Sequence, residues 1–191
     1  AAALAPTDRQ VYVNHKNGKT ERLTDAEGWN SALFSGDYQY FINTWSDYNT
    51  PYVYTTRTRA GKVISTLQDN SQLRQTIKEY GFCKREAFSF TTSEGVTLNG
   101  WMLRPLDFDA SKRYPVIMHQ YSGPGSQQVK NAWSAGSMGQ GGAYDSYLAQ
   151  QGFIVVSVDG RGAGGRGAEC EKCTYLNLGD LESRDQVETA L

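Results

Sequence analysis

Short runs in which hydrophobic and polar residues alternate fill the first third of the chain, and turn-forming residues separate them. Such alternation is typical of strands that bury one face. Asn17-Gly18 lies between the first two runs and indicates a hairpin. Strands of this length and spacing suit a sandwich, a barrel or a propeller blade. The runs cover residues 10–14, 20–24, 31–34, 38–45, 51–57 and 62–67.

The pattern then changes, and a short helix is predicted over residues 72–80, with Gly81 as its stop. We place a domain boundary at this point, so that residues 1–80 form one domain and residues 81–191 another. The second domain opens with a predicted pair of strands. They cover residues 85–92 and 96–104.

Two apolar runs, residues 116–118 and 153–158, each end in a glycine-rich turn. Such runs favour strands that are buried on both faces of a parallel sheet. A helix predicted over residues 144–151 would join them by a right-handed crossover. A last helix is predicted over residues 181–191. Two parallel strands are too few for an independent sheet, so we expect a fragment whose sheet is completed elsewhere.

Ligands of parallel α/β sheets bind beyond the carboxyl ends of the strands. Tyr121 and Asp159 follow the two runs, so both are expected near any site on this chain. A tyrosine held there can donate a hydrogen bond to the negative oxygen of a tetrahedral acyl-transfer intermediate. The alternative is a ring that only packs and leaves its hydroxyl in water, and position alone favours that alternative.

Charge and composition exclude several classes of protein. Of the 191 residues, 19 are basic and 20 acidic, which gives no general attraction to nucleic acid or to an anionic membrane. No apolar run is long enough to span a bilayer. Residues 1–6 lack the basic head and apolar core of a signal peptide. Three cysteines are too few for a disulfide framework.

The stretch from Gly162 to Gly167 reads G-x-G-x-x-G after a predicted strand, which is the fingerprint of a dinucleotide site. In such a site the glycines open a helix whose amino terminus holds the pyrophosphate. Here Glu169 and Glu171 would place two carboxylates beside the phosphates. Dinucleotide binding therefore remains an alternative that we do not favour.

Other side chains that could carry chemistry have simpler interpretations. Cys170 and Cys173 lack the second ligand pair that zinc needs, so we interpret them as small apolar filler, and we expect Cys83 to be buried. His119 lies in a predicted buried strand and is interpreted as a satisfied core residue. No Gly-x-Ser-x-Gly motif is present, so the chain holds no complete set of nucleophile, base and acid.

Five motifs stand in register along the second domain. They are residues 93–101 (SEGVTLNGW), 114–116 (YPV), 121–127 (YSGPGSQ), 159–162 (DGRG), and 178–180 (LGD) with 185–186 (DQ). Together they resemble the prolyl oligopeptidase family of serine peptidases, above all the dipeptidyl-peptidase IV branch in a bacterial form. Residues 43–51 (NTWSDYNTP) resemble the last propeller blade of that branch.

The resemblance implies a mixed β and α/β fold, because the family joins an eight-bladed β-propeller to an α/β-hydrolase domain. Residues 1–80 would be the end of the propeller, and residues 81–191 the truncated first part of the hydrolase domain. The family's serine nucleophile would follow Leu191, with its Asp and His further on. The acidic residues that hold the amino terminus of the substrate would lie in an earlier blade. We therefore expect this chain alone to be inactive.

Three residues match positions at the family's active site. Tyr121 matches the tyrosine of the oxyanion hole, and Pro124 and Gln127 match a turn beside the leaving group, where contact with the substrate is implied. Three other matched positions look structural: Asp159, Arg161 and Asp185.

The resemblance implies a serine exopeptidase that releases Xaa-Pro or Xaa-Ala dipeptides through an acyl-enzyme, without metal or cofactor. Its partners would be peptides with a free amino terminus, and a homodimer of the whole protein is expected. The family suggests the periplasm or the cell surface. A propeller that serves only as an interaction module is the alternative function.

Overall fold

The computed structural model describes residues 5–191; residues 1–4, which open the stretch considered for a signal peptide, lie outside the described part. The described chain divides into two compact units. The first holds the residues up to Tyr80 together with Lys130–Trp133. The second holds Gly81–Val129 and Ser134–Leu191. Among residues 5–191 no helix has the length and hydropathy needed to cross a bilayer.

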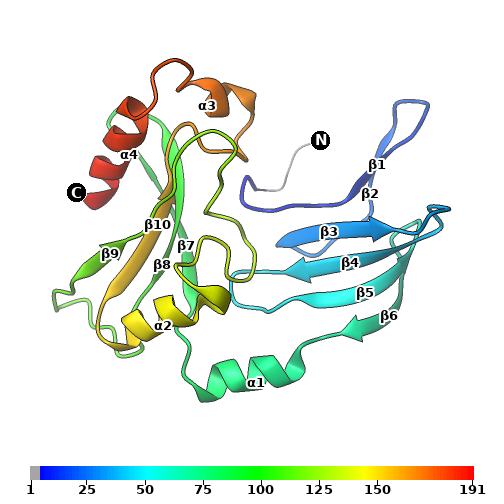
Figure 1. Cartoon of the computed structure of the whole chain (residues 1–191), viewed down its shortest axis with the longest axis horizontal. Helices are drawn as coiled ribbons and strands as arrows, with labels where there is room; N and C mark the ends of the chain where they lie inside the picture. The colour runs from blue at the N-terminus through cyan, green and yellow to red at the C-terminus, as the bar shows by residue number, and fades with distance from the viewer. Residues whose placement is uncertain (1–4) are drawn as a thin grey trace. The chain divides into compact units, whose positions relative to one another are not determined.

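The first unit contains a four-stranded antiparallel sheet, in the order β3-β4-β5-β6, and a separate two-stranded hairpin (Figure 1). The hairpin predicted around Asn17-Gly18 is confirmed, because Tyr12 pairs with Arg22 across it. The helix predicted after the sheet is also present. The elements are β1 Tyr12–Asn14, β2 Thr20–Arg22, β3 Trp29–Phe34, β4 Tyr40–Ser46, β5 Val53–Thr58, β6 Val63–Gln68 and α1 Ser71–Glu79.

A segment from far along the chain also packs within the first unit. The side chain of Asn131 donates to Asp8 at 2.9 Å and accepts from the backbone N–H of Tyr48 at 3.0 Å. The backbone N–H of Trp133 donates to the hydroxyl of Ser46, at 3.1 Å. The local sequence pattern gives no sign of these contacts, because their partners lie more than eighty residues apart.

The second unit contains a mixed sheet in the order β7-β8-β10-β9. The predicted parallel pairing is confirmed, since Val116, Ile117 and Met118 pair with Ile154, Val155 and Val156. The strands are β7 Arg85–Thr91, β8 Thr97–Leu103, β9 Val116–Met118 and β10 Ile154–Asp159, and the helical segments are η1 Gln140–Gly142, α2 Ala143–Gln150, α3 Ala168–Lys172 and α4 Asp180–Ala190.

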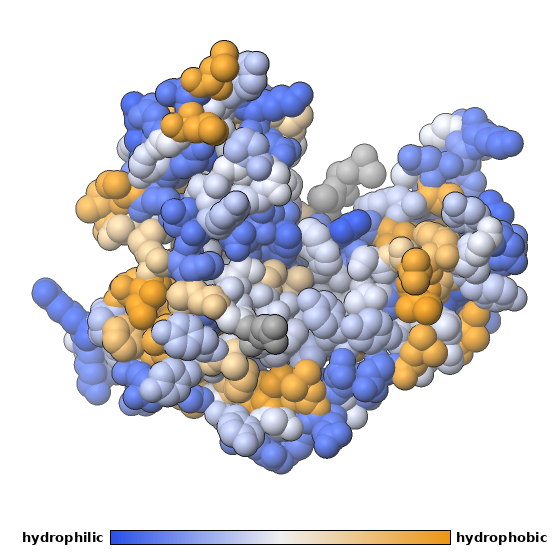
Figure 2. All heavy atoms as spheres, viewed as in Figure 1, coloured by the Kyte–Doolittle hydropathy of each residue, from blue (hydrophilic) through white to orange (hydrophobic). Residues whose placement is uncertain are grey.

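The sheet differs from the predicted pair of parallel strands in one respect that matters for burial. β8 pairs antiparallel with both β7 and β10, so the sheet has four strands in the described residues and β9 lies at its edge. Val116 on β9 is consequently 56% exposed, and the prediction that this strand is buried on both faces is wrong. On the face in Figure 2, hydrophobic residues reach the surface in separate groups with polar residues between them.

His119 also differs from its prediction as a satisfied core residue. Its backbone N–H continues the pairing of β9 by donating to the carbonyl of Val156 at 2.9 Å. The side chain is only half-buried, and its Nδ1 has no hydrogen-bond partner in the part of the chain that the structure describes. The short edge strand ends before this residue, so the sheet does not enclose the ring.

The core of the second unit lies on the central strands of its sheet. Leu98 on β8 and Val158 on β10 are buried together, and Phe88 packs against them. Gly100 sits between the Phe88 ring and Val158, where a Cβ atom would overlap both side chains. A residue without a side chain is therefore needed at Gly100 for this packing.

Candidate functional site

The candidate site lies on the loop that follows β9, residues 120–129, which we name the Tyr121 loop. Its tip is a turn closed by a hydrogen bond from the N–H of Ser126 to the carbonyl of Gly123, at 3.2 Å. Gly125 has a φ of 77°, which suits the third position of a type II turn, and Pro124 occupies the second position, where proline is common. The glycine-rich sequence thus specifies a sharp turn beyond the carboxyl end of the strand.

Tyr121 projects from this loop and does not pack in the core. Its side chain is 67% exposed and lines an open pocket of about 550 Å³. The interpretation of Tyr121 as a packing residue is therefore wrong, whereas its role in an oxyanion hole stays a prediction. The pocket is lined by Gln120, Tyr121, Ser122, Gly123, Pro124, Leu178, Gly179 and Glu182.

The two other predicted site residues lie in different surroundings. Pro124 is exposed and lines the same pocket as Tyr121. Gln127 is half-buried, and its side-chain amide donates to the carbonyl of Val129 at 3.2 Å. Its amide group also lies against Gly165, where a Cβ atom would overlap it. The structure therefore brings Tyr121 and Pro124 together and turns Gln127 toward the neighbouring glycine-rich loop.

Asp159 holds the far end of the Tyr121 loop. It is buried at the end of β10, and its carboxylate accepts the backbone N–H groups of Gln128 at 2.9 Å and Val129 at 2.8 Å. Hydrogen bonds from backbone N–H groups to a carboxylate are charge-assisted and therefore strong. Asp159 thus fixes the loop rather than facing the pocket with a free carboxylate.

The stretch from Gly162 to Gly167 does not have the surroundings of a dinucleotide site. The helix that follows it, α3, has only five residues and carries Glu169 and Glu171 in its first turn. The Gln127 amide already occupies the space over Gly165. A pyrophosphate bound here would lie beside two carboxylates and would overlap the Gln127 amide, so the geometry disfavours dinucleotide binding.

The cysteines follow their predictions only in part. Cys83 is buried, as predicted, and burial raises the pKa of its thiol, while a hydrogen bond with Ser146 opposes that shift. Cys173 is exposed and its Sγ donates to the carbonyl of Cys170 at 2.9 Å, so the prediction of apolar filler is wrong for Cys173. No group of three or more potential metal ligands occurs in the described residues.

Sequence reasoning missed the wall of the pocket opposite the Tyr121 loop. Leu178, Gly179 and Glu182 form it, at the amino terminus of α4. Glu182 is buried, and its carboxylate accepts the N–H of Gly179 at 2.9 Å. A glutamate three residues after the residue that caps the helix, as Glu182 is after Gly179, is a signal for this kind of cap, so the element was detectable in the sequence.

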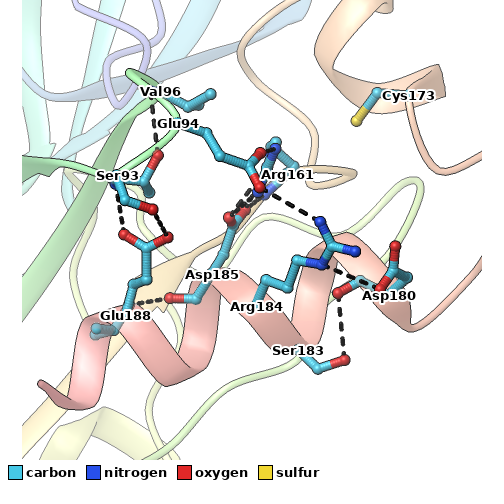
Figure 3. A network of polar contacts seen from close by, with 12 residues as sticks. Ser93, Glu94, Val96, Arg161, Cys173, Asp180, Ser183, Arg184, Asp185 and Glu188 are labelled. Atoms are coloured by element: carbon cyan, nitrogen blue, oxygen red, sulfur yellow. Dashed lines mark hydrogen bonds and ion pairs between the residues drawn. The ribbon is translucent and has the colours of Figure 1, made fainter.

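A network of charged groups fixes α4 against the turn between β7 and β8 (Figure 3). Arg161 donates from Nε and Nη2 to the fully buried Asp185, with a shortest distance of 2.7 Å, and also pairs with Glu94. The hydrogen bonds with Asp185 raise the pKa of the Arg161 guanidinium, although burial opposes this. The hydrogen bond from Arg161 in turn lowers the pKa of the Glu94 carboxyl.

Comparison with known proteins shows which family the chain resembles. The model of the prolyl oligopeptidase family matches residues 143–191, and that of the dipeptidyl peptidase IV N-terminal region matches residues 1–52. The crystal structure of Porphyromonas gingivalis dipeptidyl peptidase 4 superposes on 97% of this chain with a TM-score of 0.89 and 43% identity. The chain is similar to the prolyl oligopeptidase family, in its dipeptidyl-peptidase IV branch, along almost its whole length. The predicted resemblance is thus confirmed.

Other relatives show the same resemblance. A probable dipeptidyl-aminopeptidase B of Aspergillus clavatus is 33% identical over 100% of the chain. The structure of a putative dipeptidyl aminopeptidase IV from Bacteroides ovatus covers 91% of the chain, with a TM-score of 0.76 and 29% identity. The chain spans 21% of the Aspergillus protein, 24% of the Bacteroides chain and 26% of the Porphyromonas chain.

The predicted fold class is confirmed as well. The antiparallel sheet of the first unit is the end of a β-propeller, and the mixed sheet with its helices is the first part of an α/β-hydrolase domain.

Proposed function

We propose that the whole protein is a serine exopeptidase that releases Xaa-Pro or Xaa-Ala dipeptides from the amino termini of peptides. Similarity to the prolyl oligopeptidase family supports this, and so do relatives that are named dipeptidyl peptidases or dipeptidyl aminopeptidases. The observation that carries the proposal is the position of Tyr121, whose exposed ring lines an open pocket beyond the carboxyl end of β9.

The reaction passes through an acyl-enzyme on a serine. The serine oxygen attacks the carbonyl carbon of the second peptide residue, and the carbonyl oxygen gains negative charge in the tetrahedral intermediate. The phenol O–H of Tyr121 donates a hydrogen bond to this oxygen. Because the charge develops only during the reaction, the donor stabilises the transition state more than the bound substrate.

The nucleophile belongs to another part of the whole protein, because these 191 residues contain no Gly-x-Ser-x-Gly motif. Pro124 shares the pocket with Tyr121 and is our candidate for contact with the leaving group. For Gln127 the contacts with Val129 and Gly165 favour a supporting role in the loop over contact with the substrate. No metal or cofactor is needed for these steps.

The test is the variant Tyr121→Phe in the whole protein, assayed with a chromogenic Xaa-Pro dipeptide substrate. Loss of one oxyanion donor is expected to lower kcat by about 10²–10³-fold with little change in KM. Tyr175→Phe is the matched control, because Tyr175 is also exposed in the same unit but does not line the pocket. Unchanged turnover by Tyr121→Phe would remove Tyr121 from the mechanism. A wild-type protein that releases no dipeptide would contradict the peptidase function and favour the alternative of a non-catalytic propeller that serves as an interaction module.

The family resemblance also supports the proposed surroundings of the enzyme. We propose peptides with a free amino terminus as substrates, a homodimer as the assembly, and the periplasm or cell surface as the compartment. Light scattering of the purified whole protein tests the dimer. Cell fractionation tests the compartment, and recovery in the cytoplasmic fraction alone would contradict it.

A further inference from the structure

The orientation of Tyr121 depends on the backbone of its loop. The ring is largely exposed, and no hydrogen bond of its phenol oxygen occurs within the described residues. A donor in an oxyanion hole is effective only if it is held in place before the charge develops. Whatever fixes the Tyr121 backbone therefore bears on catalysis, a consideration that rests on the function proposed above.

Ser126 holds the loop from the inside. It is only 9% exposed, and its hydroxyl lies 2.7 Å from the carbonyl oxygen of Gly123 and 3.1 Å from the carbonyl oxygen of Tyr121 itself. Its backbone carbonyl accepts the N–H of Gly164 at 2.7 Å, which ties the turn to the neighbouring glycine-rich loop. One buried side chain thus joins the start of the turn, its end and the backbone of Tyr121.

Glu171 holds the tip of the loop from the outside. Its carboxylate accepts the backbone N–H of Gly125, 46 residues away in the chain, at 3.0 Å. Gly125 has a positive φ at the third position of the turn, so this bond restrains a backbone conformation that glycine readily adopts. Glu169, on the same helix, is exposed and makes no such contact.

We propose that Ser126 and Glu171 are positioning residues for the oxyanion donor. The Ser126 hydroxyl restrains the carbonyl of Tyr121, and the Glu171 carboxylate restrains the turn, so that the phenol is aimed at the pocket before substrate binds. Neither side chain lines the pocket, so neither needs to touch the substrate. Their effect on catalysis passes through Tyr121.

The experiment is a set of double-mutant cycles in the whole protein, with kcat and KM measured on a chromogenic Xaa-Pro substrate. Ser126→Ala and Glu171→Ala are expected to lower kcat about tenfold or more, because a displacement of about 1 Å in a catalytic group can cost about a hundredfold. KM should change by less than about twofold, since the donor acts in the transition state. Ser126→Thr and Glu171→Gln keep the hydroxyl or the accepting oxygen and should retain most of the activity.

The decisive comparison is with the Tyr121→Phe background. If Ser126 and Glu171 act through the phenol, their replacement by alanine changes kcat by less than about twofold once the phenol is absent. An equal loss in both backgrounds would mean a general structural role and would overturn the inference. Full activity of both single variants would overturn it as well. Glu169→Ala is the control, because it removes the same charge from the same helix without affecting the Tyr121 loop. Its kcat and KM are expected to match those of the wild type.

Failure of this inference is distinguishable from failure of the proposed function. Wild-type protein that does not release dipeptides contradicts the function, and Tyr121→Phe with full activity contradicts the role of the phenol and therefore of both positioning residues. A large loss in Tyr121→Phe beside normal Ser126→Ala and Glu171→Ala contradicts the positioning roles alone. If Ser126→Ala does not fold, the more exposed Glu171 variants still decide the question.

Discussion

The buried pair of Arg161 and Asp185 gives the sharpest prediction of stability. Asp185 is fully buried on α4, and its carboxylate accepts the backbone N–H of Arg161 at 2.6 Å in addition to the guanidinium. Replacement of Asp185 by alanine leaves a buried guanidinium with Glu94 as its remaining acidic partner. Removal of one member of a buried ion pair typically costs about 3–5 kcal/mol. Because Glu94 remains, we expect a loss near the lower figure, about 3 kcal/mol.

Equilibrium unfolding of the chain in urea measures this loss. With a slope of about 2 kcal/mol per molar urea, a loss of about 3 kcal/mol lowers the midpoint by about 1.5 M. Arg184→Gln is the control on the same helix: its ion pairs with Asp180 and Glu94 are exposed, so the change should stay below about 1 kcal/mol. A shift for Asp185→Ala no larger than that of the control would refute the reasoning.

The pair also predicts the result of replacing both partners. Two apolar residues of similar volume leave no uncompensated charge, and such exchanges are often neutral or stabilising. The double variant Arg161→Met with Asp185→Leu should therefore recover most of the stability that Asp185→Ala loses. A double variant at least as unstable as the single one would contradict the view that the uncompensated charge dominates the loss.

Three further predictions concern other groups. The folded protein lowers the pKa of Glu94, so the ionised carboxylate stabilises the fold fully at pH values above the ordinary pKa of glutamate, and this stabilisation is lost as the pH falls through the lowered pKa. Glu94→Gln should therefore weaken the fall of the urea midpoint at acid pH. An unchanged fall would contradict this. N-ethylmaleimide should label the exposed Cys173 at neutral pH much faster than Cys83, whose burial raises its pKa, and mass spectrometry would reveal equal rates if this is wrong. Gly100→Ala should cost about 1–3 kcal/mol through overlap with its neighbours, whereas Gly36→Ala meets no atoms and should be nearly neutral in the same unfolding assay.

The sequence by itself determined the local elements of this protein. Apolar runs bounded by glycine-rich turns predicted both parallel strands, because burial selects such runs and glycine permits the turns that end them. Gly123-Pro124-Gly125 likewise specified the turn beside Tyr121, since the proline and the following glycine favour its backbone angles. The five motifs in register indicated the resemblance to the prolyl oligopeptidase family, which no single element indicated.

Only the tertiary structure decided which of these elements meet. In the described sheet β9 pairs only with β10, so it is an edge strand and Val116 is exposed, although its apolar run predicted burial. The tertiary structure also places the Gln127 amide against Gly165 and the Glu171 carboxylate at the backbone N–H of Gly125. These contacts join residues up to 46 positions apart in the sequence. The periodicity of a sequence indicates which face of an element a residue occupies, but it does not indicate which distant residue packs against that face.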